Sequence, residues 1–277
     1  MKRFLLCTDL DRTLIPNGAH PESPSAMQRF RHLVSREEIT LAYVSGRHRA
    51  LIEQAIAKYD LPQPDFAIAD VGSTIYRIDA SGWRQWDEWD AQIAPDWHGL
   101  AHDELYRLLC VFSALRLQEQ EKQSRRKLSF YAPLDTGVQE LLGEMDVRLK
   151  QAGIRANLIW SIDEAAAIGL LDVLPASANK LHAITFLMRQ QGFGRENTVF
   201  AGDSGNDLDV LNSGIQSVLV ANADAETKRL AADGTGCLYI AKGGYLSMNG
   251  NYSAGILEGL AHYLPEVDAW LRQTDQT

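Results

Sequence analysis

Two carboxylates, Asp9 and Asp11, follow the apolar run Phe4–Thr8 and stand one residue apart. The apolar run predicts a buried strand, and open α/β sheets bind their ligands beyond the carboxyl ends of their strands. Acids held there could provide a nucleophile and a proton donor for group transfer. The spacing alone is weak evidence, because it recurs at Asp207 and Asp209 and an exposed turn would also explain a single pair.

Two further segments could bind the phosphoryl group of a substrate. Ser45, Gly46 and Arg47 follow a predicted strand at 39–44 and bring together a hydroxyl, backbone N–H groups at a helix start and a guanidinium. Lys180 opens a predicted helix, where its charge opposes the helix dipole but could neutralise a phosphate. Both segments also have plain structural explanations, a serine helix cap in the first case and a solvated lysine in the second.

The segment at 202–207 reads G-D-S-G-N-D and follows a predicted buried strand at 198–201. It places Asp203 and Asp207 four residues apart, with two glycines that permit close approach of the backbone. If these acids join Asp9 at one edge of a sheet, their charges repel one another unless a divalent cation binds between them. Oxygen ligands in an incomplete cage favour Mg²⁺, because water and substrate phosphate can fill its remaining positions. The alternative is a turn without a metal.

Strands and helices alternate in the two outer parts of the chain, residues 1–79 and 175–277. This alternation predicts an α/β fold whose core domain is a doubly wound parallel sheet with helices on both faces. Residues 80–174 differ, because they contain clustered tryptophans, a long polar helix expected from about Asp96 to Ser124, and strand–helix–strand groups. They are expected to form an inserted α+β domain.

The composition argues against some classes of function. A formal net charge of −9 argues against nucleic-acid binding, since phosphate backbones select basic surfaces. An anionic substrate therefore needs a locally positive site. No apolar stretch approaches the roughly 18 residues that cross a bilayer, and the apolar run after Met1–Arg3 is too short for a signal peptide. The three cysteines are widely separated, as expected for a cytoplasmic protein.

Four segments, each after a predicted strand, together resemble a known family. D-L-D-R-T at 9–13, V-S-G-R at 44–47, N-K at 179–180 and G-D-S-G-N-D at 202–207 resemble, in this order, the motifs of the haloacid dehalogenase-like (HAD) phosphohydrolase superfamily. The insertion resembles its C2-type cap. Further segments, such as L-A-Y-V-S-G-R, D-V-G-S-T-I-Y near residue 70, D-V-L-P and S-A-G-I-L-E-G-L-A-H-Y, resemble the sucrose-phosphate phosphatase branch. Mannosylfructose-phosphate phosphatases look similar, and the motifs do not separate the two.

The resemblance implies a role for each motif residue. Asp9 is the expected nucleophile, which forms an aspartyl-phosphate, and Asp11 is the expected general acid and base, with its side chain pointing away from the metal. Ser45 and Lys180 are expected to bind the phosphoryl oxygens, and Lys180 also to restrain Asp9. Thr13 is expected to fix the loop by hydrogen bonding. The resemblance also places Gly46 and Arg47 beside the substrate. The ligands of Mg²⁺ that it implies are Asp9, the backbone carbonyl of Asp11, Asp203 and Asp207.

Substrate choice is expected to come from the inserted domain. Lys127, Tyr131 and Asp172 lie near predicted strand ends there and suit sugar hydroxyls, and Asn206 could reach the sugar from the core. The implied reaction is Mg²⁺-dependent hydrolysis of a sugar phosphate, foremost sucrose 6-phosphate, with a sucrose-phosphate synthase as the suggested protein partner. Another sugar-phosphate phosphatase, a phosphomutase, a phosphorylatable receiver-like switch and a non-catalytic phosphosugar-binding module remain as alternatives.

Overall fold

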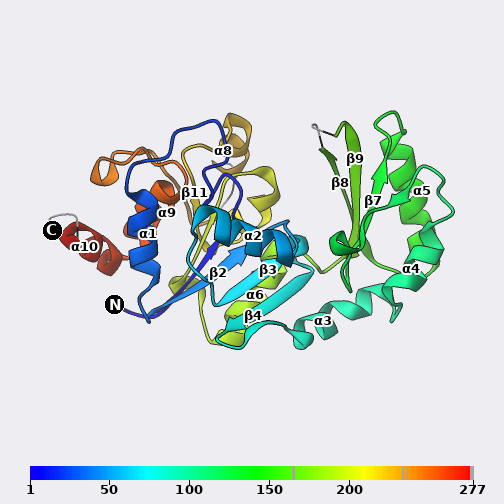
Figure 1. Cartoon of the computed structure of the whole chain (residues 1–277), viewed down its shortest axis with the longest axis horizontal. Coiled ribbons are helices and arrows are strands. Elements are labelled where there is room, and N and C mark those ends of the chain that lie inside the picture. Colours follow the sequence, from blue (N-terminus) through cyan, green and yellow to red (C-terminus); the bar gives the residue numbers. More distant parts are fainter. Residues whose placement is uncertain (164–165, 233, 235, 275–277) are drawn as a thin grey trace.

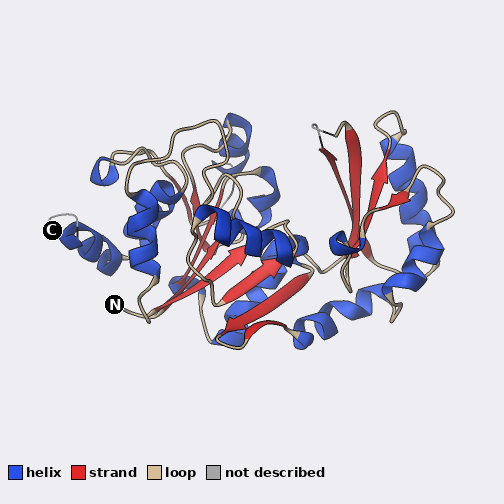
Figure 2. Cartoon of the chain, viewed as in Figure 1, coloured by secondary structure: helices blue, strands red, loops and turns tan. Residues whose placement is uncertain are grey.

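The computed structural model describes residues 1–163, 166–232, 234 and 236–274. Its centre is an eight-stranded sheet (Figure 2). Six neighbouring strands are parallel to one another. At one edge a hairpin of two strands is added, whose first strand pairs antiparallel both with the sixth strand and with its own partner in the hairpin. In spatial order the strands are β12 (Leu238–Ile240), β11 (Gln216–Leu219), β10 (Thr198–Gly202), β1 (Phe4–Thr8), β2 (Ile39–Val44), β3 (Phe66–Ala69), β4 (Thr74–Asp79) and β5 (Gly82–Gln85).

Helices cover both faces of this sheet (Figure 1). Successive side chains of a strand point to opposite faces, so Phe4 and Leu6 of β1 pack in one hydrophobic cluster and Leu5 and Cys7 in another. The predicted α/β fold with a parallel sheet between two helix layers is therefore confirmed. The first cluster contains residues of α1 (Ala26–Val34), α2 (Arg49–Tyr59), α9 (Ser253–Tyr263) and α10 (Pro265–Thr274), and the second of α3 (Asp87–Ile93), α6 (Lys180–Gln191), α7 (Leu208–Leu211) and α8 (Ala225–Ala232).

A smaller, four-stranded antiparallel sheet lies between α3 and α6 in the chain. Two helices cover the side of this sheet that faces away from the large sheet (Figure 1), and a third hydrophobic cluster fills the space beneath them. We call this part the inserted unit. Its strands, in spatial order, are β6 (Arg116–Leu117), β7 (Leu128–Ala132), β9 (Ile168–Pro175) and β8 (Ala156–Asp163), and its helices are α4 (His102–Leu109) and α5 (Val138–Gln151).

Residues 82–93 pack with the large sheet. β5 pairs with β4, and Trp89 of α3 lies in the second hydrophobic cluster. Trp97 lies instead in the cluster of the inserted unit. We therefore propose that the inserted unit spans about 94–175, and thus begins later than the sequence pattern indicated.

The prediction of one long helix from about Asp96 to Ser124 is wrong. α4 covers only His102–Leu109, and β6 and a short 3₁₀ turn follow it. His98 and Gly99 both have positive φ, 53° and 80°, which ends the turn before α4. β6 exists because it pairs with β7, and this pairing outweighs the helix propensity of the charged residues around it.

The described helices are short. The longest of them, α5, has 14 residues. Across the described ranges, no helix is long and apolar enough to cross a bilayer.

Candidate active site

Three carboxylates meet at the carboxyl end of the large sheet. Asp9 follows β1, while Asp203 and Asp207 follow β10, and the parallel pairing of β1 with β10 brings these strand ends together. One oxygen atom of each carboxylate lies within 4.8 Å of those of the other two. All three side chains are buried. Such a concentration of like charge is unfavourable unless cations compensate it.

The loop after β10 takes its shape from a glycine. A Cβ atom on Gly202 would lie 2.6 Å from Oδ2 of Asp207, so a larger residue would prevent this carboxylate from folding back over the strand end. The same oxygen accepts hydrogen bonds from the backbone N–H groups of Asp203 and Ser204, at 3.1 and 3.3 Å. The close approach expected for the glycines of this segment is thus found at Gly202.

Lys180 is a buried cation within this group of acids. Its Nζ donates to Oδ1 of Asp9 at 2.9 Å and to Oδ1 of Asp207 at 2.7 Å, and it also contacts Oδ1 of Asn206 at 3.2 Å. The side chain is only 3% exposed. It opens α6, whose N-terminus is capped by Asn179, which accepts a hydrogen bond from the backbone N–H of His182. The alternative of a solvated surface lysine is therefore wrong.

The surroundings raise the pKa of two of the acids. Burial raises the pKa of Asp9 to about 7, with Lys180 opposing and Asp207 and Asp203 adding to the rise. Burial and the charge of Asp207 likewise raise the pKa of Asp203 to about 6, and Arg12, whose Nε lies 3.3 Å from Oδ2 of Asp203, opposes this rise. Burial alone would lower the pKa of Lys180, but the charges of Asp9 and Asp207 hold it above its ordinary value. Lys180 and Arg12 therefore compensate the acids only in part.

The cluster fits a divalent cation. Carboxylate oxygens are hard donors, and the three groups are close enough to share one ion. A cation would relieve the mutual repulsion that, after burial, adds to the raised pKa of Asp9 and Asp203. Thr13 is fully buried beside them and donates its hydroxyl to Oδ1 of Asp203 at 3.1 Å. Asp9, Asp203 and Asp207 could therefore hold a divalent metal.

The side chain of Asp11 lies outside this cluster and is bound by an arginine. Both of its oxygens accept from Arg47, at 2.8 Å from Nε and 2.7 Å from Nη2, and Asn17 donates to Oδ1 at 2.7 Å. Burial would raise the pKa of Asp11, but these hydrogen bonds and the charge of Arg47 hold it below its ordinary value. A general acid must carry a proton, so this arrangement describes the carboxylate in its ionised form.

The loop after β2 contributes a buried hydroxyl but not a free guanidinium. Ser45 is 1% exposed, and its Oγ accepts the backbone N–H of Arg47 at 3.2 Å. Gly46 lines the cavity described below, whereas the guanidinium of Arg47 is engaged with Asp11 and with the carbonyl of Leu51. The sequence expectation that Arg47 faces a phosphate directly stays untested, and in this structure its partner is Asp11.

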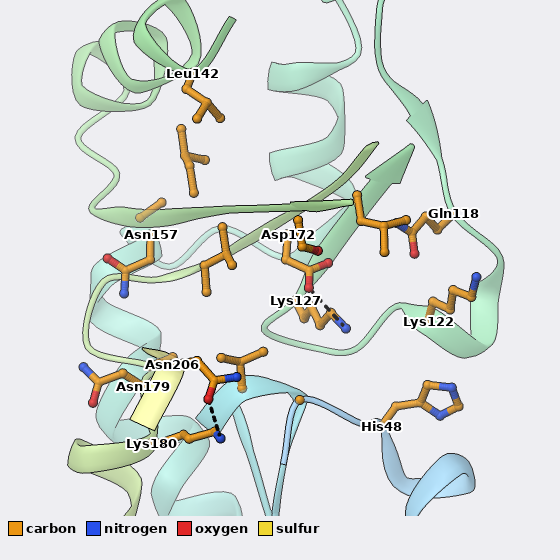
Figure 3. A pocket seen from close by; sticks show the side chains of 18 of the residues that line it. His48, Gln118, Lys122, Lys127, Leu142, Asn157, Asp172, Asn179, Lys180 and Asn206 are labelled. Atoms are coloured by element: carbon orange, nitrogen blue, oxygen red, sulfur yellow. Dashed lines mark hydrogen bonds and ion pairs between the residues drawn. The ribbon is translucent and has the colours of Figure 1, made fainter. Parts of the chain in front are cut away.

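A cavity of about 1030 Å³ lies between the carboxyl end of the large sheet and the inserted unit (Figure 3). On the side of the large sheet it is lined by Lys180 at the start of α6 and by Asn206 in the turn after β10, and from the inserted unit by Lys127 and Asp172. Lys122 adds a third lysine, but three aspartates also line the cavity, so the lysines offer cationic contacts to an anionic substrate without making the lining positive as a whole.

Tyr131 is the predicted sugar contact that does not line this cavity. Its hydroxyl accepts from Nζ of Lys122 at 2.6 Å and donates to Glu119 at 2.8 Å. The cavity instead presents polar side chains that the sequence did not single out, among them Gln118 and His48. Gln118 follows the short β6, whose existence depends on pairing with β7, so no local pattern marked it.

Comparisons with known proteins identify the family of the chain. The model of a protein family described as sucrose-6F-phosphate phosphohydrolase matches residues 2–264. A putative HAD-like hydrolase of Nitrosococcus oceani is 54% identical over 275 residues, which are 98% of this chain and 74% of that protein. Sucrose-phosphatase 1 of Nicotiana tabacum is 28% identical over 81% of this chain, and the match spans 51% of the plant protein, about half its length.

Two further proteins resemble the chain over nearly its whole length. The mannosylfructose-phosphate phosphatase of Agrobacterium fabrum is 28% identical over 94% of this chain and 96% of its own. The crystal structure of the sucrose-phosphatase from Synechocystis, in complex with sucrose and phosphate, superposes with a TM-score of 0.72 and 25% identity, covering 95% of this chain and 98% of that one. The fold, the carboxylate cluster with its lysine and the match of the family model lead to one conclusion: the chain belongs to the sucrose-6F-phosphate phosphohydrolase family of HAD phosphatases.

Proposed function

We propose that the protein hydrolyses a disaccharide phosphate, foremost sucrose 6-phosphate, with Mg²⁺ and through an aspartyl-phosphate intermediate. The observation that carries this proposal is the position of Lys180, buried between Asp9 and Asp207 and at the same time part of the lining of the cavity. A group placed there can restrain a carboxylate nucleophile and meet an incoming phosphate. The fold's match to the family adds the reaction class, a phosphoric monoester hydrolysis.

Asp9 attacks phosphorus in line and takes the phosphoryl group, so the bond from phosphorus to the sugar oxygen breaks while the bond to a carboxylate oxygen forms. Asp11 gives its proton to the leaving sugar oxygen and then takes a proton from the water that cleaves the aspartyl-phosphate. Ser45 and Lys180 bind the phosphoryl oxygens. Bound Mg²⁺ supplies charge neutralisation, with Asp9, Asp203, Asp207 and the backbone carbonyl of Asp11 as its ligands.

The pairing of Asp11 with Arg47 has to loosen for this reaction. In the structure both carboxylate oxygens accept from the guanidinium, an arrangement that favours the ionised form of Asp11. A phosphoryl dianion that enters beside Ser45 competes for Arg47, which follows Ser45 by two residues. Its competition raises the pKa of Asp11, so that this group can hold the proton that the leaving oxygen needs.

The cavity favours a disaccharide. Its volume of about 1030 Å³ lies just above the range of about 300–1,000 Å³ for small-molecule sites, which leaves room for two sugar rings. Asp172 of the inserted unit and Asn206 of the large-sheet part line it from two sides, as a two-ring ligand requires. Mannosylfructose phosphate is the second candidate, since the phosphatase named for it matches over 94% of this chain. A phosphomutase remains the alternative that shares the same core.

The test is a phosphate-release assay across sucrose 6-phosphate, mannosylfructose phosphate, glucose 6-phosphate and fructose 6-phosphate, with Mg²⁺. We expect sucrose 6-phosphate to be preferred in kcat/KM by about tenfold or more, equivalent to about 1.4 kcal/mol of transition-state binding. A preference for simple hexose phosphates contradicts the disaccharide assignment, and transfer to a second sugar position without phosphate release supports the mutase. Treatment with EDTA should abolish activity and added Mg²⁺ restore it. Full activity in metal-free buffer contradicts the metal assignment.

A synthase that makes the sugar phosphate is the proposed protein partner, and the cytoplasm the proposed location. A glucosylglycerol-phosphate synthase of Pseudomonas anguilliseptica is 27% identical over 80% of this chain, and the match occupies 26% of that longer protein. A segment similar to this chain thus occurs within a protein named as a synthase. Co-purification of the protein with a sucrose-phosphate synthase of the same cell tests the association, and separate elution at micromolar concentration of both contradicts it.

A further inference from the structure

The turn that follows β3 has an unusual backbone. Asp70, Val71 and Gly72 have φ of 52°, 59° and 98°, so three consecutive residues occupy the left-handed region. A β-branched residue such as Val71 rarely adopts this conformation, and strained turns persist only where their surroundings hold them. The contacts of the turn therefore show which parts of the molecule it supports.

Two of these contacts reach the loop that carries Ser45. The backbone N–H of Asp70 donates to the carbonyl of Arg47 at 3.1 Å, and that of Val71 donates to the carbonyl of Ser45 at 3.1 Å. Both carbonyls belong to the loop whose hydroxyl and N–H groups are proposed to face the phosphate. The position of this loop therefore depends directly on the turn.

The turn also lies against the start of α6. A Cβ atom on Gly72 would lie 2.5 Å from the carbonyl carbon and oxygen of Asn179 and 2.9 Å from the backbone N of Lys180, so only glycine fits. On its other side, the indole N–H of Trp89 donates to the carbonyl of Gly72 at 3.0 Å. One turn thus packs against both segments that present the phosphate-binding groups, the loop with Ser45 and the helix start with Lys180.

The side chain of Asp70 connects this turn to the inserted unit. It is 2% exposed, and its Oδ1 lies 3.4 Å from Nζ of Lys127, which precedes β7 and lines the cavity. The same Nζ lies 3.6 Å from Oδ2 of Asp172 on β9 (Figure 3), and the hydroxyl of Ser129 donates to Asp172 at 2.5 Å. Burial raises the pKa of Asp70, and the charge of Lys127 opposes the rise. Lys127 is therefore shared between a sugar-side carboxylate and the turn.

We propose that Asp70 is a positioning residue. Through its contact with Lys127 it makes the turn depend on the position of the inserted unit. The turn in turn positions the loop with Ser45 and the start of α6 with Lys180. The inference rests on the proposed function, because it assigns a second task to groups placed beside the sugar. When a sugar occupies the cavity and holds the inserted unit in place, the pair Lys127–Asp70 fixes the turn, and the turn fixes both phosphate-binding segments. A substrate without a sugar gains less of this ordering, because nothing then holds the inserted unit against the large-sheet part.

The first test compares two substrates in the variant Asp70→Asn. Asparagine tolerates the left-handed region well, so the change removes the charge and keeps the backbone. We expect kcat for the preferred sugar phosphate to fall about tenfold with KM changed less than about twofold, because Asp172 remains. For para-nitrophenyl phosphate, which has no sugar, we expect kcat to change by less than about twofold.

A matched control comes from the neighbouring ion pair. Asp90 of α3 accepts from Nε and Nη2 of Arg126, at 2.9 and 3.1 Å, so it also joins the inserted unit to the large-sheet part, but it does not touch the turn. Asp90→Asn should leave the ratio of the two kcat values unchanged. The inference is overturned if the ratio of the two kcat values falls equally in Asp90→Asn and Asp70→Asn. It is also overturned if Asp70→Asn lowers kcat equally for both substrates.

A second measurement does not depend on activity. Lys127→Met removes the partner of Asp70 from the other side, and we expect faster hydrogen exchange at residues 45–48 and 69–73 than in the unaltered protein and in Asp90→Asn. Unchanged exchange at both segments overturns the inference even if Asp70→Asn fails to fold. If the unaltered protein hydrolyses neither substrate, the proposed function fails, and the exchange result still decides the role of the turn.

Discussion

Replacing Lys180 by methionine removes the one lysine that binds Asp9 and Asp207, and the structure sets the size of the effect. Nζ lies 2.9 Å from Asp9 and 2.7 Å from Asp207, and the side chain is only 3% exposed. Breaking a buried ion pair by removing one partner leaves an uncompensated buried charge, which costs about 3–5 kcal/mol. We therefore expect Lys180→Met to lower the free energy of unfolding by about this amount in metal-free buffer at neutral to alkaline pH.

A lysine on the surface provides the matched control. Nζ of Lys150 lies 2.6 Å from Oδ2 of Asp146, at a distance like those of Lys180, but the lysine side chain is 71% exposed. Exposed pairs contribute only about 0–1 kcal/mol, because water screens them. Lys150→Met should therefore change the free energy of unfolding by less than about 1 kcal/mol.

The loss in free energy of unfolding caused by Lys180→Met should depend on pH. Burial and neighbouring acids raise the pKa of Asp9 to about 7 and that of Asp203 to about 6, against about 3.9 in an unfolded chain. The folded protein therefore binds more protons than the unfolded chain between about pH 4 and pH 7, so these two groups lower stability as pH rises through that window. Without Lys180 the pKa of Asp9 rises further above about 7, so the loss of stability in Lys180→Met grows as pH rises from about 6 to about 8 and beyond.

The measurement is urea unfolding of the unaltered protein and both variants near pH 5 and near pH 8 in EDTA, together with kcat in Mg²⁺. A loss in Lys180→Met no larger than in Lys150→Met would refute the argument that the lysine compensates buried acids. So would a loss of equal size at both pH values. Turnover should fall by about a hundredfold or more, since the nucleophile loses its restraint and the phosphate a ligand.

Three further predictions concern single residues. Asp9→Asn should abolish turnover while the circular dichroism spectrum stays unchanged, and retention of more than a few per cent of kcat removes Asp9 as the nucleophile. Arg47→Ala removes the hydrogen bonds that hold the pKa of Asp11 below its ordinary value, so the descending limb of the pH profile of kcat should move to higher pH. A limb that stays in place contradicts the control of the general acid by Arg47. Gly72→Ala places a Cβ 2.5 Å from the backbone of Asn179 at a φ of 98°. It should lower the free energy of unfolding, measured in urea, by about 2 kcal/mol or more. A loss below about 0.5 kcal/mol contradicts the packing described for the turn.

Local sequence patterns predicted the elements of the large sheet well. Short apolar runs such as Phe4–Thr8 and Ile39–Val44 became strands buried along their whole length, because a parallel strand covered by helices on both faces has no polar side. Chemistry-bearing residues that directly follow such runs, Asp9 and Ser45 among them, were therefore placed correctly at the carboxyl end of a strand. The start of α6 at Lys180 was predicted for a similar reason, since Asn179 is a good helix cap.

The inserted unit was predicted less well, because its elements depend on partners distant in the chain. β6 is two residues long and exists through its pairing with Phe130 and Tyr131, so the charged sequence around it indicated a helix instead. The same pairing brings Tyr131 near Lys122 and Glu119, which bind its hydroxyl and keep it from the cavity. Neither result follows from propensity or periodicity.

The amino-acid sequence by itself determined which residues stand at strand ends and helix starts, because apolar periodicity, caps and glycines act over a few neighbouring residues. Only the tertiary structure decided which of these ends meet. Pairing of β1 with β10 joins Asp9 to Asp203 across more than 190 positions of sequence, and the packing of α6 then inserts Lys180 between the acids. The bond from Arg47 to Asp11 is likewise a contact between separate strand ends, which short-range patterns do not encode.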